Sequence, residues 1–240
     1  MSVSPLRLGL VAPPALREGP PLAILAERAG WDSLWLPEDR WSPAPSDTAV
    51  IRAGRIIGHG EVTSGSTDPV WLRGPAAADR VATWRAMRPR PAGISADAVN
   101  TDAANAIESA GAIPVFGPAP LQELLSLLGS FGGPAAVFLP ASPGRTEAES
   151  HARLDADPEL RLEALRAPGL TGTLDHCQRT VAALYLAGLR ELRLRVPATP
   201  DVADVIAQVS ALRAEALARL EPGSPRSPAP AAPGGWGGRQ

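Results

Sequence analysis

The sequence predicts an α/β fold, a TIM-barrel-like (β/α)8 barrel that is incomplete and has six or seven strands. Apolar runs of strand length alternate along the chain with segments of helical periodicity, which is the pattern of parallel strands joined by helices. The 240 residues, of which 45% are apolar, suffice for one large domain with a substantial core. Neither GxGxxG nor GxxxxGKS/T occurs, so neither a dinucleotide-binding fold nor a P-loop NTPase is indicated.

The first elements form a βαβ unit. In order they are a strand at Leu6–Ala12, a helix at Pro20–Ala29 that stops at Gly30, and a strand at Ser33–Pro37. Two strands separated by one helix at this spacing are expected to pair in parallel.

The middle of the chain is harder to fit to a complete barrel. A third strand is expected within Ile51–Val62, and helices are expected over Pro75–Met87 and Ala96–Ala110. The chain between Leu72 and Ile113 looks too short for the strand–helix pairs that a complete barrel needs. We therefore expect part of the middle of the barrel to be missing.

The second half of the chain alternates more regularly. Expected strands are Ile113–Phe116, Ala135–Leu139 and Leu192–Val196. Expected helices are Leu121–Leu128, Thr146–Arg166 with a break at Pro158, Thr173–Ala187, and a last helix that opens at Thr199-Pro200-Asp201. After Glu221 the composition changes to Pro, Gly, Ser and Ala. We therefore expect a barrel domain over residues 1–220 and a disordered tail over residues 221–240.

Composition excludes several classes of function. The formal net charge of −2 gives no basis for binding nucleic acid or a membrane surface. The chain has no Lys, which excludes Schiff-base chemistry, and its single cysteine, Cys177, excludes a disulfide framework. The three His lack the spacing of metal ligands. There is no signal peptide and no run of about 20 apolar residues, so we expect a soluble, cytoplasmic, bacterial protein.

Candidate catalytic residues follow the second and third strands, because functional groups in a parallel barrel gather where the strands end. Glu38, Asp39 and Arg40 follow the second strand, and one of them is expected to contact a cofactor or a substrate. The alternative is a solvated loop with a weak surface ion pair. His59 lies between two glycines and is a candidate acid–base residue. The alternative is a His at a strand end with satisfied hydrogen bonds.

Further residues are candidates for ligand binding. If the Leu and Val of Leu192–Val196 face the helices, Arg193 and Arg195 point into the barrel. Arg195 is the better candidate for binding an anion, and an internal salt bridge is the alternative. Gly117 precedes a helix whose N-terminus can hold a phosphate, although two prolines remove donors there. Trp35 can line a ligand pocket or pack in the core.

Several stretches, taken in order, resemble the luciferase-like monooxygenases. LRLGLVAPP and AERAGWDSLWLPED resemble the start of that family, and RIIGHGEVTSGSTDPVWL is similar to its third strand and following loop. GTLDHCQRTVAALYLAGLRELRLRVPATPDVADVIAQVSAL is similar to its last helix, strand and helix, and IPVFGPAPLQELLSLLG and PGRTEAES also fit. The resemblance implies a (β/α)8 barrel that uses reduced FMN or a deazaflavin coenzyme.

The sequence also departs from this family. Members are commonly longer, and in many of them a His follows the acid at the end of the second strand, whereas here Glu38 is followed by Asp39. The position between the glycines of the third strand is His59 instead of a small residue. The Gly-rich phosphate loop is reduced to Gly117-Pro118-Ala119-Pro120. Each of these departures affects a position that the resemblance assigns to cofactor binding.

The leading hypothesis is a shortened luciferase-like oxidoreductase or monooxygenase that acts on a small organic substrate. Its expected catalytic residues are His59 and Asp39, its expected cofactor-binding residues are Trp35, Glu38, Gly117 and Arg195, and no metal is expected. The alternative is a non-catalytic, degenerate barrel that binds a flavin or serves as a partner subunit. Open sheet edges would favour a homodimer or a heterodimer with a related barrel. An unrelated small (β/α) enzyme is a third reading, which no motif supports.

Overall fold

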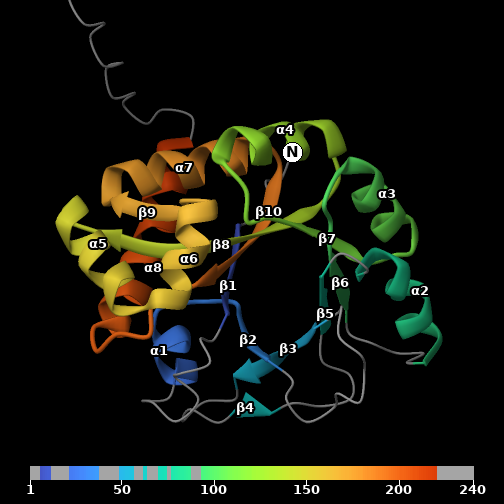
Figure 1. Ribbon diagram of the computed structural model, residues 1–240, viewed down its shortest axis with the longest axis horizontal. Coiled ribbons are helices and arrows are strands. Elements are labelled where there is room, and N and C mark those ends of the chain that lie inside the picture. The colour runs from blue at the N-terminus through green and yellow to red at the C-terminus, as the bar shows by residue number, and fades with distance from the viewer. Residues whose placement is uncertain are drawn as a thin grey trace, which may run out of the picture.

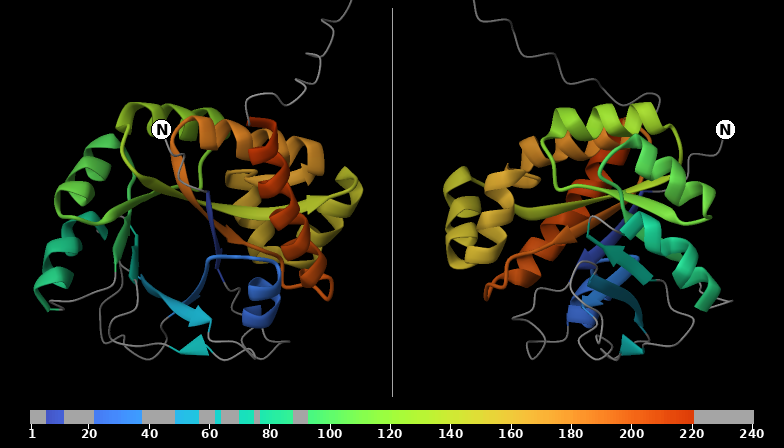
Figure 2. Two further views of the ribbon diagram at one scale, coloured as in Figure 1. Left: turned by 180° about the vertical axis from the view of Figure 1, so that it is seen from behind. Right: turned by 45° about the vertical axis from the view of Figure 1, so that its right-hand side comes forward.

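The computed structural model describes residues 6–11, 22–37, 49–56, 62–63, 70–74, 77–87 and 93–220. Strands curl around a common centre, and the helices lie on their outer side (Figures 1 and 2). The expected tail, residues 221–240, lies outside the described residues. Within the described part, no helix is both long enough and apolar enough to cross a membrane.

Eight strands pair in a ring. They are β1 (Arg7–Val11), β2 (Ser33–Pro37), β3 (Ala49–Ile56), β5 (Val70–Arg73), β6 (Ile94–Asp97), β7 (Ile113–Phe116), β8 (Ala135–Gly144) and β10 (Leu189–Arg195). Each pairs with the next, and β10 pairs in parallel with both β8 and β1. Seven of these strands are parallel, whereas β3 is antiparallel to β2 and to β5. The α/β, TIM-barrel-like prediction is confirmed, and the (β/α)8 plan is incomplete because β3 takes the place of a parallel strand.

Eight described helices accompany these strands. They are α1 (Leu22–Arg28), α2 (Ala77–Met87), α3 (Thr101–Ser109), α4 (Leu121–Phe131), α5 (Glu147–Ala156), α6 (Pro158–Arg166), α7 (Leu174–Leu186) and α8 (Val202–Leu220). Two short strands complete the set: β4 (Val62–Thr63) pairs with β3, and β9 (Leu170–Thr173) pairs with the outer half of β8. No helix follows β2 or β3 in the described part of the chain.

Side chains from alternate strand positions form two separate cores. The larger core lies between the strands and the helices and includes Leu192 and Leu194 of β10. The smaller core fills the centre of the ring with Val11, Trp35, Trp71, Val115, Ala136 and Phe138. The inward direction predicted for Arg193 is confirmed, because its guanidinium lies against the Trp35 and Trp71 rings.

Local signals placed several elements correctly. Pro158 opens α6 after α5 ends, and the Asp157 side chain accepts a hydrogen bond from the Leu160 amide, at 3.0 Å. The Thr173 hydroxyl accepts from the His176 amide at the start of α7. The apolar stripe of α8, from Val202 to Leu212, is buried.

The expectation that the middle of the barrel is missing was wrong. Residues 70–109 hold β5, α2, β6 and α3, because β5 and β6 need only four residues each. The helix expected over Ala96–Ala110 begins at Thr101, where Asn100 caps it by accepting from the Ala103 amide. The residues before that cap form β6, in which Ile94 and Ala96 face the outer core.

Candidate functional site

The strand arrangement gives the barrel two distinct ends. The carboxyl ends of the seven parallel strands meet at one end, where (β/α)8 enzymes carry their active sites. Trp71 and Arg73 come from β5, Asp97 is the last residue of β6, and Phe138 comes from β8. These four side chains contact one another and form what we call the carboxyl-end cluster.

Asp97 lies at the centre of the carboxyl-end cluster. One carboxylate oxygen accepts from Trp71 Nε1 at 2.7 Å, and the other accepts from the Gly74 amide at 2.9 Å. Arg73 Nε lies 3.8 Å from that second oxygen. Burial raises the pKa of Asp97 above its ordinary value of 3.8, although these hydrogen bonds and Arg73 act in the opposite direction. Asp97 therefore holds its proton to a higher pH than a free aspartate does.

Arg73 lies over two aromatic rings at the same end. Its guanidinium carbon is 4.9 Å from the centroid of the Trp71 ring and 4.6 Å from that of Phe138. Its Nε atom is buried and has no hydrogen-bond partner among the described residues. A buried donor without a partner is costly, so Arg73 can bind an additional acceptor at little cost in existing contacts.

A second arginine lies deeper in the ring. Arg193 is 1% exposed, donates from Nε to Glu191 at 2.9 Å, and donates from Nη1 to Ser95 Oγ at 2.8 Å. Its guanidinium carbon is 3.8 Å from the centroid of the Trp35 ring and 4.9 Å from that of Trp71. The barrel interior is thus a packed column of aromatic and charged side chains.

The structure places three of the six predicted site residues. Trp35 is buried in this column, and its Nε1 donates to Ser33 Oγ at 2.9 Å. Gly117 has a φ of +113° and lies against the Phe138 carbonyl, so the backbone itself requires a glycine there. Glu38, Asp39 and His59 lie outside the described residues.

Arg195, the third of these residues, forms the internal salt bridges that were the alternative to anion binding. Its Nη1 and Nη2 atoms lie 2.8 Å from carboxylate oxygens of Glu163 and Glu159 on α6, and Nη2 is 3.8 Å from Asp157. The carboxylates of α6 therefore already neutralise this guanidinium. No group of three or more potential metal ligands occurs in the described ranges.

Sequence reasoning missed the carboxyl-end cluster. Trp71, Arg73 and Asp97 belong to the segments VWLR and ISAD, which are too short for a convincing periodic signal. Their alternation was nevertheless readable, because in both segments every second residue is apolar and faces the helices. The other residues of these strands were therefore inward-facing candidates.

Stability should depend on pH through Asp97. In the folded state the pKa of Asp97 lies above 3.8, its ordinary value. Between these two pKa values the folded state therefore binds more protons at Asp97 than the unfolded state does. The contribution of Asp97 to the free energy of unfolding should therefore fall with rising pH. We expect urea unfolding from pH 3 to pH 7 to show the Asp97→Asn variant gaining stability relative to the unmodified protein as pH increases. Parallel stability curves would contradict this expectation.

Comparison with known proteins shows a likeness of fold. The solved structure of apo-MsnO8 matches 89% of this chain and 98% of its own, with a TM-score of 0.50 and 14% identity. The monooxygenase RslO1 from Streptomyces bottropensis matches 55% of this chain and 49% of its own, with a TM-score of 0.38 and 18% identity. Dihydropteroate synthase from Thermus thermophilus matches 92% of this chain and 96% of its own, with a TM-score of 0.24 and 13% identity.

Sequence comparison adds nothing to this likeness, because no family model and no curated protein sequence matches the chain. The similarity to apo-MsnO8 supports the fold alone, since the identity is low. At that level it agrees with the barrel implied by the resemblance to luciferase-like monooxygenases.

Proposed function

We propose that this chain is an oxidoreductase of the luciferase-like monooxygenase type, which binds reduced FMN or a deazaflavin at the carboxyl end of its barrel and acts on a small organic substrate. The observation that carries the proposal is the Arg73–Asp97 pair over Trp71, placed at the carboxyl end of a barrel similar in fold to apo-MsnO8. Carboxyl groups with a perturbed pKa at that end of a barrel are typical of functional sites.

The residues present fit a flavin-like coenzyme in two respects. A positive charge beside the pyrimidine edge of the ring stabilises the anionic reduced form, and Arg73 has a buried donor free for such a contact. The first-turn amides of α4, behind Gly117, can bind a phosphate, because Pro120 makes no side-chain cap there. Arg195, already bound by carboxylates, is the less suitable phosphate contact.

The chain's own residues would have three tasks in this reaction. The coenzyme, when bound, supplies the electrons. Arg73 binds and orients an anionic group, while Asp97 fixes Arg73 and Trp71 and can hold a proton on its carboxyl group near the substrate. Trp71 and Phe138 shield the site from water. The proposed catalytic roles of His59 and Asp39 remain part of the hypothesis.

Anaerobic titration with reduced FMN or the reduced deazaflavin, followed by tryptophan quenching, tests the proposal. We expect saturable binding, and we expect Arg73→Gln to weaken it at least about tenfold, which corresponds to about 1.4 kcal/mol. Arg179→Gln is the matched control, because Arg179 is 65% exposed on α7. The control should bind as tightly as the unmodified protein.

No saturable binding of any of these coenzymes would overturn the oxidoreductase proposal. One observation then favours a non-catalytic partner subunit: Leu162 and Leu165 of α6 and Leu186 of α7 are 60%, 72% and 71% exposed. Exposed apolar side chains of this size suit an interface with a second copy or a related barrel. Light scattering of the purified protein separates a monomer from such a dimer.

A further inference from the structure

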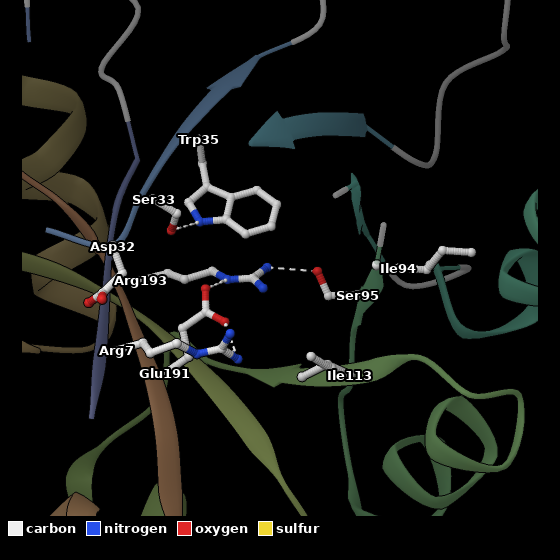
Figure 3. Close-up of a pocket in the computed structure, with 10 residues that line it drawn as sticks. Arg7, Asp32, Ser33, Trp35, Ile94, Ser95, Ile113, Glu191 and Arg193 are labelled. Carbon is white, nitrogen blue, oxygen red and sulfur yellow. Dashed lines mark hydrogen bonds and ion pairs between the residues drawn. The ribbon is translucent and has the colours of Figure 1, made fainter. Parts of the chain in front are cut away.

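A pocket of about 240 Å³ lies at the amino end of the barrel, opposite the carboxyl-end cluster. Its lining includes first residues of β1, β2 and β7, which places it among the strand starts. Figure 3 shows Arg193 beneath the indole of Trp35, between Glu191 and Ser95, with Ile113 on the facing side. We call this feature the amino-end pocket.

The two arginines of the amino-end pocket share one carboxylate. Glu191 is the partner of both Arg193, at 2.9 Å, and Arg7, at 3.5 Å. The other acidic residue of the lining, Asp32, is held by Arg213 at 3.0 Å and by the Leu8 amide at 2.8 Å. Among the described residues Arg7 therefore has only a shared partner, at 3.5 Å, and its guanidinium can bind an anion at the mouth of the pocket.

The amino-end pocket has polar groups on one side and an apolar side chain on the other. Arg7 is 54% exposed at the mouth, whereas Arg193 and Trp35 are buried at the floor. Ser33 Oγ accepts from Trp35 Nε1, and its own hydroxyl proton has no acceptor among the described residues. Ile113, which packs against the inner core, provides an apolar side. A ligand with one anionic end and one apolar end would match this arrangement.

We propose that the amino-end pocket binds a small organic monocarboxylate. Arg7 and the Ser33 hydroxyl bind the carboxylate, a charge-assisted arrangement that gives Arg7 an anionic partner of its own. The apolar part of the ligand lies against Ile113. The volume is just below the range of ordinary small-molecule sites, so the ligand is smaller than a typical coenzyme. This site lies at the other end of the barrel from the coenzyme site proposed above and does not depend on it.

The probe is sodium benzoate, with neutral benzamide as its matched control. Binding is followed by calorimetry and by the indole N–H signals of ¹⁵N-labelled tryptophan, which are assigned with single Trp→Phe variants. We expect benzoate to bind at least ten times more tightly than benzamide and to shift the Trp35 signal most. Inorganic phosphate tests whether the charge alone is enough, and we expect it to bind more weakly than benzoate.

Three variants locate the site. Arg7→Gln should weaken benzoate binding at least tenfold while remaining folded, because Arg7 is exposed, and Ser33→Ala should weaken it less. Arg73→Gln, and the surface control Arg179→Gln, should leave it unchanged. Equal binding of benzamide or phosphate, or no effect of Arg7→Gln, would overturn the proposal. So would benzoate binding that Arg73→Gln abolishes, since it would place the carboxylate at the carboxyl end.

Discussion

Replacing Arg193 by Met should lower the free energy of unfolding by about 3–5 kcal/mol, the usual cost of removing one partner of a buried ion pair. The substitution removes the 2.9 Å partner of the Glu191 carboxylate, 8% exposed, and leaves it only the more exposed Arg7 at 3.5 Å. It also removes the guanidinium that lies 3.8 Å from the Trp35 ring centroid and takes the donor from Ser95 Oγ. Urea unfolding at pH 7 provides the measurement.

A double variant shows whether charge is the cause. Arg193→Met/Glu191→Gln also removes the buried carboxylate that has lost its 2.9 Å partner, so the double variant should be more stable than Arg193→Met alone. Arg179→Met removes an exposed pair on α7 and should change stability by less than about 1 kcal/mol. A loss below about 1 kcal/mol in Arg193→Met, or a double variant less stable than the single one, would contradict a role for this pair in holding the barrel interior.

Gly117→Ala should destabilise the protein by about 3 kcal/mol or more, from two causes. The residue has a φ of +113°, which L side chains adopt only under strain of about 1–3 kcal/mol. A Cβ atom would also clash with the backbone carbonyl oxygen of Phe138. That oxygen belongs to β8, whose Phe138 pairs with Arg193 of β10, so it cannot move without disturbing the ring.

Gly188→Ala is the matched control, because Gly188 has a φ of +106° but no atom within 4 Å of the position of a Cβ. It should show the cost of the backbone conformation alone, about 1–3 kcal/mol. The difference between the two variants in urea unfolding then measures the clash with Phe138. Equal losses would show that the Phe138 carbonyl yields, and would leave the positive φ as the only reason for a glycine at position 117.

Local patterns determined much of the outer layer of this protein. Helix α7 follows from its Thr173 cap and helix α8 from its apolar stripe, and the inward direction of Arg193 follows from the alternation of β10. These features depend on residues within a few positions of each other, and a periodic run of about seven or more residues is enough to reveal them. The expected β1–α1–β2 unit, with its parallel pairing, has the same origin.

The inner layer was decided by tertiary contacts. VWLR and ISAD become strands because each finds a neighbour in the ring, and β3 takes its place there antiparallel to both β2 and β5. The Arg73–Asp97 pair joins two different strands, and Arg195 finds its carboxylates on α6.

Sequence alone determined which faces of the helices and of β10 are apolar, because burial on one face imposes a local period. Only the tertiary structure decided which polar side chains inside the barrel meet. Inward-facing charged side chains need partners at hydrogen-bond distance. In a ring of strands these partners lie on other strands, which are far away along the chain. Trp35 and Arg193 could be named from the sequence, whereas Trp71, Arg73 and Asp97 became candidates only when β5 and β6 took their places beside each other.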